Sequence, residues 1–349
     1  MSVRPLAIVI VMSFCVGGSV AQKDSTAAAI HTYLQPYAQS GNFAGDVLVV
    51  KSGKVIFEKA YGFADREHHI RNTAATRFHI ASMSMQFTAA AVLRLVDTSS
   101  IKLDDRVGGF VPGIQGADKI TIRDLLTQRS GLPDINALAN YDNVLQHHQT
   151  PSSLIAEIEG RPLLFEPGSK FLHEEHSAYN LLALIVEKKS GLPFAAAVDR
   201  WLFQPANLVA SGVDDDSKTH ATRVAKGYEP EGTYRLKPAR AIHWSAKTGN
   251  ASVCTSLIDL TGKKSRLNAV HRKNLLHSFT IAFKERCPAP NDRVFLTVGR
   301  LLFPNERRVL FVWFCQPLGK VPHLVLWGWL LCAAVPDRDL LTSNLAFPG

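Results

Sequence analysis

Residues 78–93 decide the fold, and they read Phe78-His79-Ile80-Ala81-Ser82-Met83-Ser84-Met85-Gln86-Phe87-Thr88-Ala89-Ala90-Ala91-Val92-Leu93. From Ala81 to Val96 the sequence is apolar on nearly all sides of a helix, which is typical of a helix buried at the centre of a domain. Two serines, Ser82 and Ser84, stand at its beginning. The sequence therefore predicts a central buried helix that carries a serine hydroxyl in its first turn.

Further helices and strands are predicted on both sides of this helix. The clearest are an amphipathic helix over 23–40, a hairpin over 45–61, and two helices over 120–127 and 177–190. The first helix should place Ile30, Leu34 and Tyr37 on one face. Residues 211–240 are polar and turn-rich, which predicts surface loops, and a second hairpin is predicted over 293–316. Strands at both chain ends with helices between them predict an α+β fold, with one antiparallel sheet from both chain ends, flanking helices and a helical insertion.

The first 21 residues are predicted to be an export signal. Arg4 supplies the positive start, residues 6–16 the apolar middle, and residues 19–21 a small-residue cleavage site before Gln22. The apolar run is too short to cross a bilayer, so we predict no stable membrane span. A chain with such a signal is expected to be secreted or periplasmic.

The net charge of +9 is distributed unevenly along the chain. Residues 1–261 hold 26 Lys and Arg against 25 Asp and Glu, a net of +1, whereas residues 262–349 hold 13 against 5, a net of +8. This contrast indicates a boundary near residue 260. The basic residues form no dense run and no nucleic-acid-binding motif accompanies them, so we predict no nucleic-acid partner. We read residues 261–349 as a divergent C-terminal part that completes the sheet. A frameshifted translation is the alternative, which the other two reading frames of the coding DNA would reveal.

Several stretches in a fixed order carry a family resemblance. The run 78–82 followed by residues 86–89 resembles the β-lactamase-related serine hydrolases, which include class C β-lactamases, D-alanyl-D-alanine carboxypeptidases and related esterases. Further stretches are similar to the same family, namely Leu103-Asp104-Asp105 through 120–127, Ser130-Gly131-Leu132-Pro133, and Phe165-Glu166-Pro167-Gly168-Ser169-Lys170-Phe171. The resemblance covers residues 25–260, the main part of the domain. It implies the β-lactamase/transpeptidase-like fold, a small-molecule or peptide substrate and no cofactor, and it leaves the oligomeric state open.

Ser82 is the predicted catalytic nucleophile. Acyl transfer by serine needs a base for the hydroxyl proton and donors for the oxyanion, and a helix N-terminus favours developing negative charge. The family's Ser-x-x-Lys motif has a lysine at its fourth position, on the same helix face as the serine. Here that position is Met85, which cannot take a proton. Ser84 and Met85 are expected to line the same pocket. Without the resemblance, Ser82 reads as an ordinary helix cap.

The family's second motif, Tyr-x-Asn, is altered in this chain. After the Phe-Glu-Pro-Gly stretch the sequence reads His173-Glu174-Glu175-His176. His173 or Glu174 could act as a substitute base, and the alternative is a solvated polar loop before a helix. The spacing is not that of His-Glu-x-x-His, so no metal site is predicted.

The family's third motif is Lys-Thr-Gly or His-x-Gly on a strand that lines the site. Lys247-Thr248-Gly249 matches the letters, which makes Lys247 a candidate pocket residue. The residues that follow, 249–260, resemble a different family segment, a glycine-containing loop that leads into a helix. The match at Lys247 is therefore weak evidence for catalysis.

These motifs predict a serine hydrolase that acts on amide or ester carbonyls through an acyl-serine, with an active site impaired by Met85. Two alternatives stay open from sequence. One is a catalytically silent binding protein for peptidoglycan-like or peptide ligands, and the other is a poorly folding product of a decayed gene.

Overall fold

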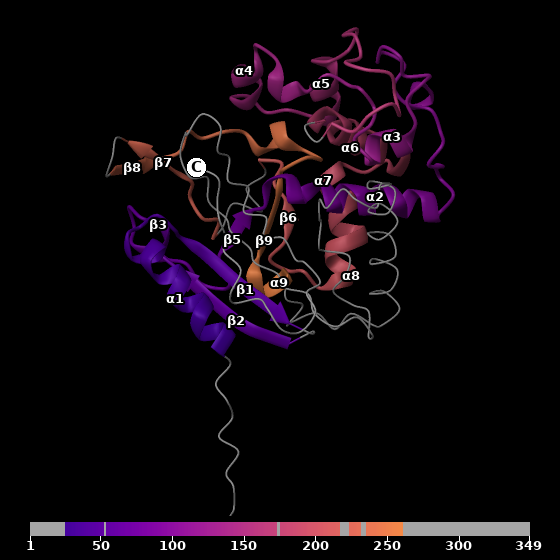
Figure 1. Ribbon diagram of the computed structural model, residues 1–349. Coiled ribbons are helices and arrows are strands. Elements are labelled where there is room, and N and C mark those ends of the chain that lie inside the picture. The colour runs from indigo at the N-terminus through magenta and orange to yellow at the C-terminus, as the bar shows by residue number, and fades with distance from the viewer. Residues whose placement is uncertain (1–24, 52–53, 173–174, 217–222, 232–234, 261–349) are drawn as a thin grey trace, which may run out of the picture.

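The computed structural model describes residues 25–51, 54–172, 175–216, 223–231 and 235–260 (Figure 1). Four of the sequence predictions lie outside these residues, namely the export signal, the roles of His173 and Glu174, and the C-terminal hairpin with the sheet it would complete. Within them the chain is a mixture of helices and antiparallel strands, which confirms the α+β class.

The N-terminal layer is a helix packed on a hairpin. The predicted helix and hairpin are both present, as α1 (Ser25–Gln39) and the antiparallel strands β1 (Gly45–Lys51) and β2 (Lys54–Tyr61), and α1 packs against the hairpin. A small core lies between them, made by Leu34, Phe43, Val47, Val49, Phe57 and Tyr61. Tyr37, which the sequence placed on the same face as Ile30 and Leu34, is 47% exposed and does not join this core. The backbone N–H of Phe43 bonds the Tyr37 carbonyl, and this turn brings the Phe43 ring into the core.

A second, three-stranded sheet lies between the hairpin and the helices (Figure 1). It contains β5 (Arg77–His79), β9 (Val253–Ser256) and β6 (Gly212–Val213), with β9 in the centre and antiparallel to both neighbours. Strand β9 runs directly into α9 (Leu257–Leu260), which contacts β1. All four residues of β9 are buried, so this strand joins the sheet to the body of the domain.

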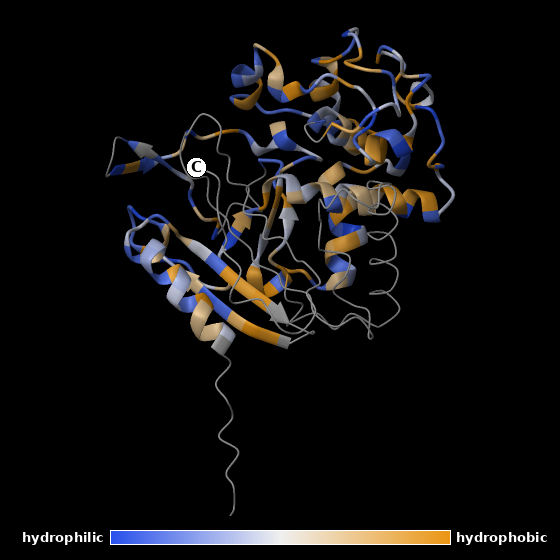
Figure 2. Cartoon of the chain, viewed as in Figure 1, coloured by the Kyte–Doolittle hydropathy of each residue, from blue (hydrophilic) through white to orange (hydrophobic). Residues whose placement is uncertain are grey.

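The helical part surrounds two long helices, α2 (Met85–Asp97) and α6 (His176–Ser190), which pack against each other. Shorter helices complete it, namely α3 (Ile122–Leu126), α4 (Tyr141–Leu145), α5 (Pro151–Ala156), α7 (Phe194–Val198) and α8 (Gln204–Ala206), with single turns η2 (Val107–Gly109), η3 (Ile135–Ala137), η4 (Asp199–Phe203) and η5 (Trp244–Lys247). The apolar residues of this region form one large core (Figure 2). Its size explains why α2 is apolar on all sides, since most of its residues are buried.

Two predictions about element boundaries need correction. The α-helix begins at Met85 rather than Ala81, because η1 (Ala81–Ser84) forms a 3₁₀ turn before it; such turns are frequent at helix ends. Residues 211–240 are not loops throughout. They contain β6 and a hairpin of β7 (Tyr228–Glu231) with β8 (Arg235–Pro238), where Tyr228 is buried. The short strands β3 (Phe63–Asp65) and β4 (Ile70–Arg71) pair with each other in an antiparallel sheet of their own. Among the described residues, no helix combines the length and apolar character needed to cross a membrane.

Candidate active site

Ser82 sits in the η1 turn and is held from both sides by one residue of β9. The backbone N–H of Ile80 donates to the Val253 carbonyl at 3.0 Å, and the Val253 N–H donates to the Ser84 hydroxyl oxygen at 3.0 Å. The residue before Ser82, Ala81, has a φ of +49°, a left-handed conformation that non-glycine residues rarely adopt. Ser82 itself is half-buried, and no hydrogen bond joins its hydroxyl to another described residue.

The structure assigns different surroundings to the two neighbours of Ser82 in the predicted pocket. Ser84 is fully buried, and its hydroxyl is occupied by the Val253 N–H. Met85 is 4% exposed, and its Sδ accepts a hydrogen bond at 3.3 Å from Nε2 of Gln128. The other amide atom, Gln128 Oε1, is buried and has no partner among the described residues. The position of the family lysine is therefore filled by a group without a titratable proton, next to an unused acceptor.

The beginnings of α2 and α6 meet at the loop that follows Lys247. Thr88 of α2 donates its hydroxyl to the Gly249 carbonyl at 2.6 Å, and Asn180 of α6 donates its side-chain amide to the Thr248 carbonyl at 2.6 Å. Gly249 has a φ of +87°, and a Cβ there would lie 2.3 Å from the Tyr179 carbonyl oxygen. Only glycine fits this close approach, so the loop is wedged between the first turns of both helices.

Lys247 stands at the end of η5 and not on a sheet strand. The sequence made the letters Lys-Thr-Gly a weak match because residues 249–260 resemble a glycine-containing loop that leads into a helix. The structure has the helix α9 there, but the strand β9 precedes it where a loop was predicted. The Lys247 amine donates to the Tyr141 hydroxyl of α4. Burial lowers the pKa of Lys247 to about 8, although the Asp134 carboxylate opposes this. Burial also raises the pKa of Tyr141, so the phenol stays protonated.

The start of α6, where the family's second motif was expected, carries two further polar contacts. His176 Nδ1 lies 3.2 Å from Asp134 Oδ1. Glu175 is completely buried and accepts three hydrogen bonds of 2.9–3.0 Å, from the backbone and hydroxyl of Ser130 and from the Gly131 N–H. Burial raises the pKa of Glu175, against the effect of these bonds. Sequence reasoning missed Glu175 because nothing in the run of two glutamates separates it from its neighbour.

Sequence reasoning also missed the contact that fixes η5 against the sheet. His79 of β5 binds Asp214 through Nε2 and Oδ2 at 2.8 Å. Its ring stacks on Trp244 of η5, with 3.4 Å between ring centroids and 6° between planes. These residues place η5, and with it Lys247, relative to the strand that precedes Ser82. The two aromatic rings lie far apart in sequence, and no local pattern relates them.

Ser82 stands just before the central buried helix α2, and polar residues gather at the start of the neighbouring helix α6. This arrangement is that of a penicillin-binding-protein-like serine hydrolase fold. The comparisons agree with this class. The family model described as Beta-lactamase matches residues 30–262, and the chain belongs to this family.

Individual relatives are similar at modest identity. PbpX of Bacillus subtilis (strain 168), described as a penicillin-binding protein, is 29% identical over 204 residues, which cover 58% of this chain and 49% of the relative. The crystal structure of a penicillin-binding protein from Bacillus halodurans is 25% identical with a TM-score of 0.58, over 70% of this chain and 76% of that one. The D-amino acid amidase of Ochrobactrum anthropi SV3 shares the fold, with 20% identity and a TM-score of 0.59 over 67% of each chain. The chain spans about half the length of the curated relatives it matches.

Proposed function

We propose that this protein is a slow acyl-serine hydrolase, with Ser82 as nucleophile and an amide or ester of a small molecule or peptide as substrate. The observation that carries the proposal is the placement of Ser82. Ser82 is half-buried, and the residues on either side of it, Ile80 and Ser84, are both hydrogen-bonded to one strand residue, Val253. It lies just before a central helix in a member of the Beta-lactamase family. A fixed nucleophile reduces the entropy lost on reaching the reactive geometry.

The proposed reaction has two steps. The Ser82 oxygen attacks the carbonyl carbon while its proton passes to a base, and the tetrahedral intermediate expels the protonated amine or alcohol to leave an ester on Ser82. Water then attacks this ester, and the carboxylic acid leaves as the serine regains its proton. The family's base at position 85 is missing, because Met85 cannot take a proton. General-base catalysis accelerates such reactions roughly 10²–10⁴-fold. The acylation rate is therefore expected to be lower by about this factor than with a lysine at position 85.

The paired side chains of Lys247 and Tyr141 are the proposed substitute for the missing base. Lys247 is anchored beside the loop wedged between α2 and α6, and its pKa is lowered by burial to about 8. An amine with this pKa is largely neutral above pH 8 and can accept a proton there. The acylation rate of the wild-type chain should therefore rise with pH through about pH 8. The rate of Lys247→Met should show no such rise.

A catalytically silent binding protein for peptidoglycan-like or peptide ligands is the second candidate. The specific observation that favours it is the burial of Met85 and its contact with Gln128. This packing fills the place of the family lysine with a well-fitted apolar side chain. A protein of this kind would bind its ligand reversibly and form no acyl-serine.

Labelling with a fluorescent β-lactam or a fluorophosphonate separates the two candidates. The enzyme forms a covalent adduct that mass spectrometry places on Ser82, and Ser82→Ala abolishes it. Ser84→Ala is the matched control, because that hydroxyl binds Val253 and should not be labelled. Reversible binding without an adduct supports the silent binder. Absence of both binding and labelling in a folded protein contradicts both candidates.

We further propose that the protein acts outside the cytoplasm, as a secreted or periplasmic protein. The charged, apolar and small-residue pattern of residues 1–21 supports export. N-terminal sequencing of the protein produced in cells tests this, and a mature chain that begins at Gln22 is the expected result. A chain that keeps its first 21 residues would contradict it.

A further inference from the structure

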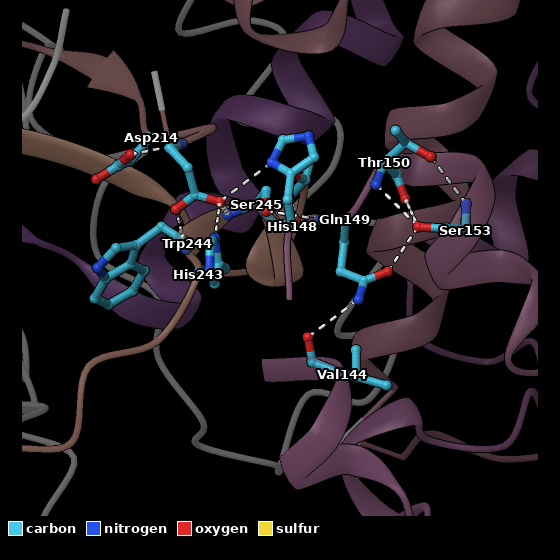
Figure 3. Close-up of polar contacts among 11 residues, drawn as sticks. Val144, His148, Gln149, Thr150, Ser153, Asp214, His243, Trp244 and Ser245 are labelled. Carbon is cyan, nitrogen blue, oxygen red and sulfur yellow. Dashed lines mark hydrogen bonds and ion pairs between the residues drawn. The ribbon is translucent and has the colours of Figure 1, made fainter. Parts of the chain in front are cut away.

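Three side chains that bind metals well meet at the beginning of η5, whereas Lys247 stands at its end. His148 comes from the connection between α4 and α5, Asp216 from the segment after β6, and His243 from the residue before η5. Asp216 Oδ2 lies 3.3 Å from His243 Nδ1 and 3.5 Å from His148 Nδ1. All three candidate ligand atoms lie within 4.8 Å of one another. Figure 3 shows His148 near Ser245 and His243, although His148 is distant from the other two in sequence.

The spacing of these atoms fits a tetrahedral ion. Zinc ligands at about 2.0–2.1 Å from a tetrahedral centre lie about 3.4 Å from one another, whereas neighbouring ligands of an octahedral ion at the same bond length lie about 3.0 Å apart. The two oxygen–nitrogen distances of 3.3 and 3.5 Å bracket the tetrahedral value. The side chains of His148 and His243 are 60% and 44% exposed, so their rings are free to turn and close the nitrogen–nitrogen distance.

The backbone around the three side chains is already fixed. Asp216 adopts a φ of +65°, and its carboxylate accepts hydrogen bonds from the N–H groups of Trp244 at 2.7 Å and Ser245 at 3.2 Å. The His243 N–H donates to the Leu145 carbonyl at 2.9 Å. Next to His148, the Gln149 N–H donates to the Ser245 hydroxyl at 2.9 Å. Hydrogen bonds to a ligand's side chain, such as those to the Asp216 carboxylate, orient that ligand in known metal sites, and the backbone bonds at His243 and Gln149 hold the chain next to the two histidines.

We propose that His148, Asp216 and His243 bind one Zn²⁺ ion, with water in the fourth position. Two imidazoles and one carboxylate are a common ligand set for zinc with an open site. The ion ties the end of α4 to the beginning of η5. The opposite ends of the same two elements are joined by Tyr141 and Lys247, so the zinc site and the Lys247–Tyr141 pair hold one contact from both sides. The proposal does not depend on catalysis by Ser82.

Zinc titration of the full chain, stripped of metal with a chelator, tests the site by calorimetry. His148→Ala and His243→Ala should each weaken binding at this site by at least about tenfold, the lower end of the loss seen when a partner that merely orients a ligand is removed. His147→Ala is the matched control, because this neighbouring exposed histidine binds the Asn143 carbonyl and should leave the affinity unchanged. Visible absorption of bound Co²⁺ provides a second readout, with an intense four-coordinate spectrum expected in the wild-type chain and its loss in both variants.

The result that overturns the proposal is equal zinc affinity and an equal Co²⁺ spectrum in the wild type, His148→Ala and His243→Ala. The three side chains would then form histidine–carboxylate pairs only. Circular dichroism confirms that the variants are folded, and the two substitutions remove side chains that are 60% and 44% exposed. Binding that disappears in His147→Ala and persists in His148→Ala would place the ion elsewhere and contradict the assignment equally.

Discussion

If Ser82 is the nucleophile as proposed, replacing Met85 by lysine should accelerate its acylation. The substitution puts an amine one helical turn from Ser82, since residues three apart share a helix face. A positioned general base contributes roughly 10²–10⁴-fold, which corresponds to a barrier lower by about 3–5 kcal/mol. The expected result is an acylation rate constant at least about 10²-fold above that of the wild-type chain.

The structure also indicates how much stability the buried amine would cost and which neighbouring group would accept a hydrogen bond from it. Lys247 shows the effect of burial on a lysine in this protein, since its pKa falls from 10.5 to about 8. A shift of this size corresponds to about 3 kcal/mol of lost stability at neutral pH, and residue 85 is at least as enclosed. Rotating the Gln128 amide by half a turn presents its unused Oε1 to the amine and offsets part of this cost. The lowered pKa also favours the neutral amine, which is the form that accepts a proton.

Stopped-flow acylation with a fluorescent β-lactam measures the rate, and urea unfolding measures the stability. Met85→Leu is the control for the loss of the thioether, because it conserves volume and supplies no base; it should change stability by less than about 1.5 kcal/mol and leave the rate unchanged. Ser82→Ala combined with Met85→Lys should abolish acylation. A folded Met85→Lys protein with the wild-type rate would refute the reasoning and locate the defect beyond residue 85.

Three further predictions concern charge and stability. Burial, and to a lesser extent the negative charge of Glu58, raises the pKa of Asp46 to about 7. Between about pH 4 and pH 7 the folded state therefore keeps a proton on Asp46 that the unfolded state has released. Stability should fall by up to about 4 kcal/mol from about pH 4 to pH 7, and Asp46→Asn should abolish this slope in urea titrations at each pH. Glu175→Ala leaves three buried donors without an acceptor, so it should lower the free energy of unfolding by about 3 kcal/mol, measured by urea unfolding. Glu166→Ala is the control, because it removes only an exposed ion pair with Lys119 and should lower that free energy by less than about 1 kcal/mol. Lys247→Met should gain stability below pH 8, where the wild type must keep a buried amine charged, and the gain should shrink between about pH 8 and 10.5 in thermal unfolding curves.

The sequence predicted the elements that depend on local patterns. The hairpin over 45–61 follows from alternating apolar residues, and the end of α6 follows from Gly191, which adopts a φ of +68°. The central helix followed from its uninterrupted apolar run, which a large core requires. The family resemblance supplied the position of Ser82 and the identity of the missing lysine at residue 85.

The polar contacts of the site could not be predicted from the sequence, because their partners are far apart along the chain. Lys247 meets Tyr141 from 106 positions away, and the Asp214 carboxylate meets His79 from 135 positions away. Such pairs arise from packing and leave no periodic signal. The short strand pair over 228–238 was missed because its residues are mostly polar and turn-forming, and only the burial of Tyr228 shows that it packs against the domain.

The clamp around Ser82 has a consequence for the order of events during synthesis. The residue that supplies both hydrogen bonds, Val253, lies about 170 positions after the serine and leaves the ribosome late. A nascent chain that ends before this residue carries the whole Ser82-to-Met85 run but lacks both of these hydrogen bonds. The hydrogen bonds around Ser82 can therefore form only once the last described strand, β9, has been made, when nearly all of the matched domain already exists.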